Sequence, residues 1–166
     1  MIIVSDTSPI NYLVLIGKQD ILQSLFQQVV IPEAVFRELQ NASTPLVVLH
    51  WAANHPAWIE VRQPTAPLDA DLLLLDEGER EAIRLAKEVN AGLLLIDDRM
   101  GREEALKRQL PVIGTLGILE QAAERGMLDF ASTLTELKRQ GFFISLALER
   151  DFLERDRQRK ALSDDQ

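Results

Sequence analysis

The chain has 166 residues, of which 46% are hydrophobic and 27% charged, so we expect a single globular domain with a sizeable core. It has no cysteine, which excludes disulfides and thiolate metal sites, and its net charge of −8 argues against broad, nonspecific nucleic-acid binding. The apolar run at the N-terminus is too short for a signal peptide or a membrane span, so we expect a cytoplasmic protein without membrane attachment.

The first predicted unit is a short apolar strand that runs directly into a helix. The strand ends at Asp6, and Ser8 and Pro9 are typical of the N-cap and the first position of a helix. An acidic residue that lies between the end of a strand and the start of a helix is a candidate site residue. Asp6 is also typical of an Asx turn, so both interpretations stay open here.

A glutamate follows in the third predicted helix, over residues 33–40. Glu38 shares a face of this helix with Val35 and Leu39. A lone glutamate on an apolar stripe is often a boundary residue whose carboxylate reaches water. A functional interpretation of Glu38 is strengthened because a second glutamate later in the chain also lies on an apolar helix face. The segment between the two glutamates is predicted to contain a further helix (45–54), a strand (58–61) and a loop (63–71).

An amphipathic helix over residues 75–86, followed by a strand over residues 93–96, organises the rest of the sequence. On this helix Glu79 lies on the apolar face, whereas the other glutamates lie among arginine and lysine residues. The spacing Asp76-x-x-Glu79 is also that of a capping box, in which Glu79 would only close the start of the helix. A catalytic and a capping interpretation of Glu79 therefore remain open.

The strand over residues 93–96 is wholly apolar and ends in two aspartates, Asp97 and Asp98. Such a strand is typical of a parallel sheet covered on both faces, and ligands of open α/β sheets bind outside the carboxyl ends of the strands. The doublet is therefore a candidate metal site, although both aspartates are also common in turns.

The remaining elements continue the alternation of strands and helices. Thr115 is expected to cap a helix while its hydroxyl lies near the pocket at the strand ends. The pattern predicts an α/β fold of three layers, in which a central, mostly parallel sheet has helices on both faces. We expect one domain over residues 1–155 and a polar tail over residues 156–166 that frays. The later predicted elements are a helix over 103–109, a strand over 111–113, helices over 116–125 and 132–140, a strand over 142–144 and a helix over 146–154.

Carboxylates at strand and helix ends form the main candidate site: Asp6, Glu38, Glu79 and either Asp97 or Asp98. In a parallel sheet, Asp6 and Asp97 leave neighbouring strands at the same edge. Carboxylates gathered in one cleft repel one another, so such a cluster is stable as anions only around a cation. Oxygen ligands without cysteine suit Mg²⁺ or Mn²⁺, and the implied chemistry is metal-assisted phosphodiester hydrolysis.

Four short motifs carry a family resemblance: Val4-Ser5-Asp6-Thr7-Ser8, Val35-x-x-Glu38-Leu39, Gly78-Glu79-x-Glu81-Ala82-Ile83 and Leu95-Ile96-Asp97-Asp98-Arg99. In this order they resemble PIN-domain proteins of the VapC toxin-nuclease type over roughly residues 2–150. Within that family, the chain is most similar to a subgroup with Gly-Glu-x-Glu-Ala and Asp-Asp-Arg-x-Gly-Arg patterns. It departs from the commoner pattern by Glu79 in place of an aspartate, by the aspartate doublet, and by the long segment after Glu38.

The resemblance implies a PIN-like fold and a metal-dependent endoribonuclease, often dimeric and often silenced by a small antitoxin. It implies that Asp6, Glu38, Glu79 and Asp97 hold Mg²⁺ or Mn²⁺, with Asp98 as the alternative to Asp97. Ser8 would support Asp6. Arg99 and Arg102 would contact RNA phosphates, or would only neutralise neighbouring acids or be solvated. The alternative function is an inactive PIN module that binds RNA or a protein partner.

Overall fold

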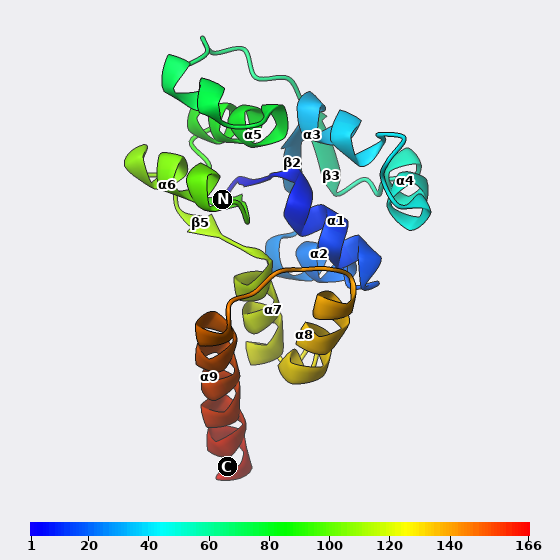
Figure 1. Ribbon diagram of the computed structural model, residues 1–166, viewed down its shortest axis with the longest axis vertical. Coiled ribbons are helices and arrows are strands. Elements are labelled where there is room, and N and C mark those ends of the chain that lie inside the picture. The colour runs from blue at the N-terminus through cyan, green and yellow to red at the C-terminus, as the bar shows by residue number, and fades with distance from the viewer. The chain divides into compact units, whose positions relative to one another are not determined.

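The computed structural model describes residues 1–166, which divide into two compact units, residues 1–115 and residues 116–166 (Figure 1). The first unit contains a five-stranded sheet in which every neighbouring pair is parallel, in the order β3-β2-β1-β4-β5. The strands are β1 (Ile3–Ser5), β2 (Val29–Pro32), β3 (Ile59–Arg62), β4 (Leu93–Leu95) and β5 (Val112–Ile113). The predicted parallel sheet is therefore confirmed.

Helices cover both faces of this sheet in a three-layer arrangement, as predicted. The α5 helix packs against β1, β2 and β4, while α2 packs against β2 and α6 against β5. The helices of the first unit are α1 (Thr7–Leu15), α2 (Asp20–Phe26), α3 (Glu33–Leu39), α4 (Leu46–Ala53), α5 (Glu77–Glu88) and α6 (Arg99–Lys107), with a 3₁₀ turn, η1 (Ala70–Leu74). No helix of the chain combines the length and the apolarity that a membrane crossing requires.

The apolar face of α5 explains why this helix is fixed against the sheet. Ala82, Ile83 and Ala86 are fully buried and belong to one hydrophobic cluster with Val4 of β1 and Leu94 of β4. Burying a side chain such as Ile83 contributes roughly 1.5–3 kcal/mol to folding. The start of α5 is therefore held firmly at the edge of the sheet where the strands end.

Adjacent strands bring the first and the last predicted acids to the same edge of the sheet. β1 and β4 pair in parallel with Ser5 opposite Leu95, and the backbone N–H of Asp6 donates to the carbonyl of Leu95 at 2.9 Å. Because parallel strands end on the same side, Asp6 and Asp97 both leave the sheet there, as expected.

The second unit consists of helices. They are α7 (Thr115–Glu124), whose first residue still belongs to the first unit, α8 (Phe130–Arg139) and α9 (Leu146–Asp164). Phe130 of α8 stacks on Phe152 of α9 with the ring centroids 5.8 Å apart. The strand predicted over residues 142–144 is not formed. Three apolar residues after a helix do not specify a strand by themselves, and here they form an irregular link in which Phe143 is exposed.

The last helix is longer than the sequence indicated. It was predicted to end at Glu154, with a fraying tail beyond, but α9 continues through Asp164. Asp156 is buried and pairs with Arg159 at 2.8 Å and with Lys160 at 3.0 Å. Such pairs three and four residues apart stabilise a polar helix that lacks an apolar stripe, which is why periodicity alone missed it.

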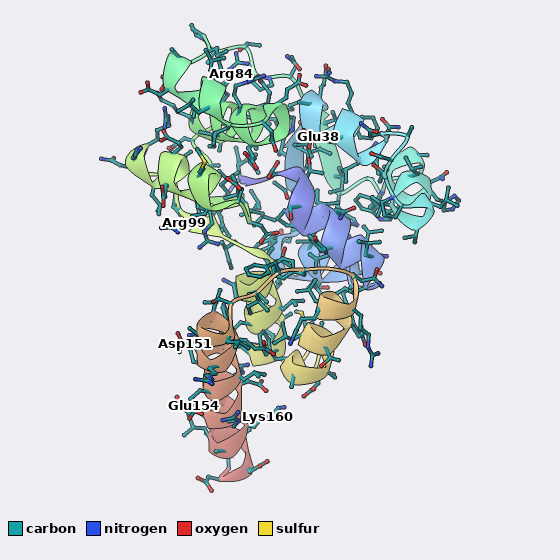
Figure 2. All side chains as sticks on the ribbon, in the orientation of Figure 1. Glu38, Arg84, Arg99, Asp151, Glu154 and Lys160 are labelled. Atoms are coloured by element: carbon teal, nitrogen blue, oxygen red, sulfur yellow. The ribbon has the colours of Figure 1, made fainter.

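An ion pair in this unit predicts a measurable acid sensitivity. Lys160, labelled in Figure 2, lies 2.8 Å from Asp129, and this contact is the main reason that the pKa of Asp129 falls to about 2. A lowered pKa stabilises the fold above about pH 4, and this contribution is lost as pH falls toward 2. Because the pair is half exposed, we expect less than about 1 kcal/mol. Thermal melts between pH 6 and pH 2 should show a smaller fall in melting temperature on acidification for Asp129→Asn than for the wild type. An equal fall in both proteins would contradict this prediction.

Candidate functional site

Asp6 is the most buried acid at the carboxyl edge of the sheet. It directly follows β1 as the N-cap of α1, and the residue is 4% exposed. Its Oδ1 atom is buried without any hydrogen-bond partner. Burial raises the pKa of Asp6 well above its usual value, and the charges of Glu79, Asp76 and Glu38 raise it further, while the backbone N–H of Thr7 partly opposes them.

Glu38 reaches the same edge from α3 (labelled in Figure 2) and accepts hydrogen bonds from two other helices. Its Oε1 atom accepts from the backbone N–H of Gly78 at 2.9 Å, and its Oε2 atom accepts from the hydroxyl of Thr7. Partial burial raises the pKa of Glu38, as does the charge of Asp76, whereas the bonds from Thr7 and Gly78 oppose the rise. Glu38 therefore joins α3 to the first turns of α1 and α5.

Glycine at position 78 leaves the space that Glu38 occupies. A Cβ atom on Gly78 would lie 2.5 Å from Oε1 and 2.6 Å from Oε2 of Glu38, far inside normal contact distance. The backbone of Gly78 is not left-handed, so its conformation does not require glycine. The sequence alone shows the Gly78-Glu79 pattern, but only the structure shows that Gly78 accommodates Glu38.

This fit predicts an unusual response to Gly78→Ala. Alanine in a helix is normally more stable than glycine by about 0.5–1 kcal/mol. In the wild type, we expect no such gain because the new methyl group displaces the Glu38 carboxylate. In the Glu38→Ala background, Gly78→Ala should raise the stability by about that amount. Urea unfolding of the four proteins measures the difference, and an equal gain in both backgrounds would show that Glu38 does not depend on this space.

Both interpretations of the Asp76-x-x-Glu79 pattern have a basis in the structure. Asp76 is the N-cap of α5 and accepts from the backbone N–H of Glu79 at 3.0 Å, so the capping interpretation is confirmed at Asp76. Partial burial raises the pKa of Glu79 to about 7, helped by the charges of Asp76 and Asp98. Asp76 is thus a further acid of this region that sequence reasoning treated only as a cap.

The two aspartates after β4 have separate roles. Asp97 accepts three hydrogen bonds: from the backbone N–H of Thr115 at 2.7 Å, from the Thr115 hydroxyl at 2.7 Å and from the Ser8 hydroxyl at 2.8 Å. Asp98 is exposed and caps α6 by accepting from the backbone N–H of Gly101 at 2.8 Å. Asp97 is therefore the member of the doublet that is held at the edge of the sheet.

Ser8 and Thr115 were both expected to cap helices, but Asp6 is the N-cap of α1 and Thr115 is already the first residue of α7. Ser8 also has a different partner from the one expected. It was expected to support Asp6, and its hydroxyl instead donates to Asp97. The reason is that Asp6 and Ser8 are two residues apart on either side of the helix start, whereas the parallel pairing of β1 with β4 brings Asp97 alongside the first turn of α1. Thr115 begins α7 and points its hydroxyl at Asp97, as expected.

The two arginines after the doublet differ in exposure and in the groups near them. Arg99, labelled in Figure 2, has a side chain that is 92% exposed and pairs with Glu103 at 3.1 Å. Arg102 is partly buried, and its Nη1 atom lies 2.7 Å from the position of a Cβ on Gly114, next to Oδ1 of Asp97 at 2.9 Å from the same point. Only Arg102 is therefore directed into the region of the carboxylates.

The predicted acids border one edge of the sheet but do not converge on a single point. No set of three or more aspartate, glutamate or histidine side chains lies close enough together to hold a metal ion. The physical reason is that like charges repel, and Glu38 and Asp97 instead accept hydrogen bonds from their own neighbours. The donor chemistry still suits Mg²⁺ or Mn²⁺, since Asp6 offers a buried, unpartnered carboxylate oxygen beside the charge of Glu79.

Comparison with known proteins identifies the family. Residues 2–158 match the DUF3368 family, which is described as a PIN domain. The chain belongs to this PIN-domain family. A solved structure similar to this PIN domain is a PilT N-terminus domain protein from the hyperthermophilic archaeon Sulfolobus solfataricus P2, with 21% sequence identity, a TM-score of 0.52 and coverage of 81% of this chain and 94% of that chain.

That structural likeness supports the fold, and no curated protein matches the sequence. PIN domains are generally nucleases, and they typically use divalent metals. The part of the resemblance that concerns the PIN domain is therefore confirmed, while the VapC-type subgroup remains a prediction.

Proposed function

We propose that this PIN domain is a metal-dependent endoribonuclease that hydrolyses phosphodiester bonds in single-stranded or structured RNA. The observation that carries the proposal is the carboxylate of Asp6, a residue that is 4% exposed; this carboxylate has an oxygen without a hydrogen-bond donor and lies among the negative charges of Glu79, Asp76 and Glu38. No basic side chain pairs with this buried carboxylate, and a buried charge without a partner is costly, so the position favours a bound cation.

In this proposal, Asp6, Glu38, Glu79 and Asp97 form the catalytic set around Mg²⁺ or Mn²⁺. Asp6 offers a buried carboxylate oxygen without a hydrogen-bond partner, while Asp97 is fixed by Ser8 and Thr115. When bound, the ion supplies an activated water and stabilises charge on the phosphate. Asp98 is occupied in capping α6, so we assign the fourth acid to Asp97.

The direct test is cleavage of a labelled single-stranded RNA by the purified chain. We expect fragments in Mg²⁺ or Mn²⁺, none in EDTA, and none from Asp6→Asn. Asp20→Asn is the matched control, because Asp20 is exposed at the start of α2 and is not part of the site. Cleavage that persists in EDTA, or that Asp6→Asn leaves intact, would overturn the proposal.

The family resemblance extends the proposal to the protein's partners. We propose that the chain is the toxin of a toxin–antitoxin pair, that it forms a homodimer, and that a small antitoxin silences it. The net charge of −8 is compatible with a basic partner. Copurification with the product of a short adjacent reading frame, together with light scattering of the free chain, tests both points; a monomer that retains no small partner would contradict them.

A second candidate function is a PIN module that binds RNA or a protein without cutting. The observation that favours it is the absence of any three acidic or histidine side chains at metal-binding distance. The two candidates differ in metal affinity. Failure to bind Mn²⁺ at millimolar concentration, combined with RNA binding, would favour the module over the nuclease.

A further inference from the structure

Arg102 is the one arginine of residues 1–115 that makes no ion pair. The other six, Arg37, Arg62, Arg80, Arg84, Arg99 and Arg108, each lie within 4 Å of a carboxylate oxygen. Arg102 is nevertheless partly buried; its backbone N–H donates to the carbonyl of Asp98, and its guanidinium donates no hydrogen bond to the protein. A guanidinium has five N–H donors and cannot lose its charge, so such a group is available to bind an anion.

Gly114 lies directly beside this guanidinium. A Cβ atom on Gly114 would lie 2.7 Å from Nη1 of Arg102 and 2.9 Å from Oδ1 of Asp97. The backbone of Gly114 is not left-handed, so no turn demands glycine there. Glycine at this position instead leaves the space that Nη1 of Arg102 and Oδ1 of Asp97 both border.

Asp97 does not form an ion pair with Arg102. The two groups do not approach within 4 Å, and Asp97 already accepts three hydrogen bonds from Ser8 and Thr115. The alternative interpretation, in which Arg102 only neutralises a neighbouring acid, is therefore not supported by a direct ion pair. Arg99 makes that kind of contact, with Glu103, and is almost fully exposed.

We infer that Arg102, seated on Gly114, is a phosphate-binding residue of this site, and that Arg99 is not. The ligand chemistry is a phosphate group carrying non-bridging oxygens, which a guanidinium binds through two parallel N–H donors. The inference rests on the proposed function for its source of phosphate, the backbone of single-stranded RNA. Arg102 positions one phosphate beside the carboxylates, and the missing side chain of Gly114 leaves room for its guanidinium.

Binding measured without cleavage tests this inference separately from the nuclease proposal. The probe is a fluorescein-labelled single-stranded RNA in EDTA, followed by anisotropy at several salt concentrations. We expect Arg102→Gln to weaken binding about tenfold and to reduce the slope of log K against log salt by about 0.7, as loss of one phosphate contact predicts for a single strand. Arg99→Gln, which removes the same charge from the same helix, should change the affinity less than twofold.

Gly114→Ala supplies a test in which the charge is retained. It should weaken RNA binding about as much as Arg102→Gln, and it should add nothing in the Arg102→Gln background, because both changes remove the same contact. Arg102→Gln should leave the thermal stability unchanged, since the side chain makes no ion pair to lose. Equal weakening by Arg99→Gln and Arg102→Gln, or a large loss of stability in Arg102→Gln, would overturn the inference.

A competition experiment with inorganic phosphate distinguishes RNA from free phosphate as the ligand of Arg102. Inorganic phosphate should compete with RNA for the wild type and should not protect Arg102→Gln against heat. If phosphate binds through Arg102 but RNA does not bind, the phosphate site stands and the ribonuclease proposal falls. If Asp6→Asn abolishes cleavage while Arg102→Gln binds RNA as the wild type does, the nuclease stands and the role of Arg102 is rejected.

Discussion

Asp6→Asn should make the metal-free chain more stable while it abolishes RNA cleavage. Asparagine has nearly the shape of aspartate and removes a negative charge that is almost completely buried near Glu79, Asp76 and Glu38. We expect a stability gain of about 1–2 kcal/mol at neutral pH, since an unsatisfied buried charge is costly. Cleavage should fall by a factor on the order of 10²–10³ or more, as expected when a principal charge-stabilising group is lost.

The pH dependence of this gain follows from the raised pKa of Asp6. A carboxyl whose pKa is higher in the folded state takes up a proton on folding, so wild-type stability is greatest below the unfolded value and declines as pH rises through the folded pKa. The advantage of Asp6→Asn should therefore be absent near pH 3 and should grow toward neutral pH. Urea unfolding in EDTA from pH 3 to pH 8 measures it, with Asp20→Asn as the control; a destabilised Asp6→Asn protein at pH 7 would contradict the burial of an unpaired charge.

Substitutions at Asp97 should have a much larger effect on stability than the same substitutions at Asp98. Asp97→Ala removes three hydrogen bonds to a carboxylate and leaves the buried backbone N–H of Thr115 without an acceptor. We expect a loss of about 3 kcal/mol, which for a chain of this size lowers the melting temperature by roughly 10 °C. Asp98→Ala removes one N-cap, for which about 1 kcal/mol is typical.

Asp97→Asn separates the structural role of this residue from its proposed catalytic one. The hydroxyls of Ser8 and Thr115 can accept as well as donate, so they can rotate to meet the new amide, and most of the stability should remain. RNA cleavage should still be lost because the negative charge is gone. Thermal melts and cleavage assays of these variants provide the measurement. If Asp98→Asn were as damaging to cleavage as Asp97→Asn, the assignment of the fourth acid to Asp97 would be wrong.

The sequence predicted the sheet and the edge at which the site lies, because those features depend on local pattern. The uninterrupted apolar residues of β4 indicated a strand covered on both faces, and parallel pairing then placed Asp6 and Asp97 on neighbouring strands. The amphipathic pattern of α5 correctly indicated that Ala82, Ile83 and Ala86 are buried, but it was wrong for Glu81. Glu81 was expected in solvent and is buried, because Arg84 pairs with its carboxylate at 2.6 Å. The family motifs led to the PIN domain that the family match confirms.

The contacts that fix the site were beyond the reach of sequence reasoning because they join segments far apart in the chain. Glu38 and Gly78 are 40 residues apart, and Ser8 and Asp97 are 89 apart, so no local spacing reveals them. The expected convergence of all the acids on one point also failed for this reason: the donors that occupy Glu38 and Asp97 come from other elements. The polar part of α9 was missed because ion pairs, and not an apolar stripe, hold it.

The central claim is that the Asp6 carboxylate belongs to a site for a divalent cation. Isothermal titration of Mn²⁺ into the metal-free chain tests it most directly, with Asp6→Asn and Asp20→Asn titrated in parallel. We predict a saturable site below millimolar concentration in the wild type and in Asp20→Asn, and none in Asp6→Asn. No saturable binding to the wild type, or equal binding to all three proteins, would contradict the claim.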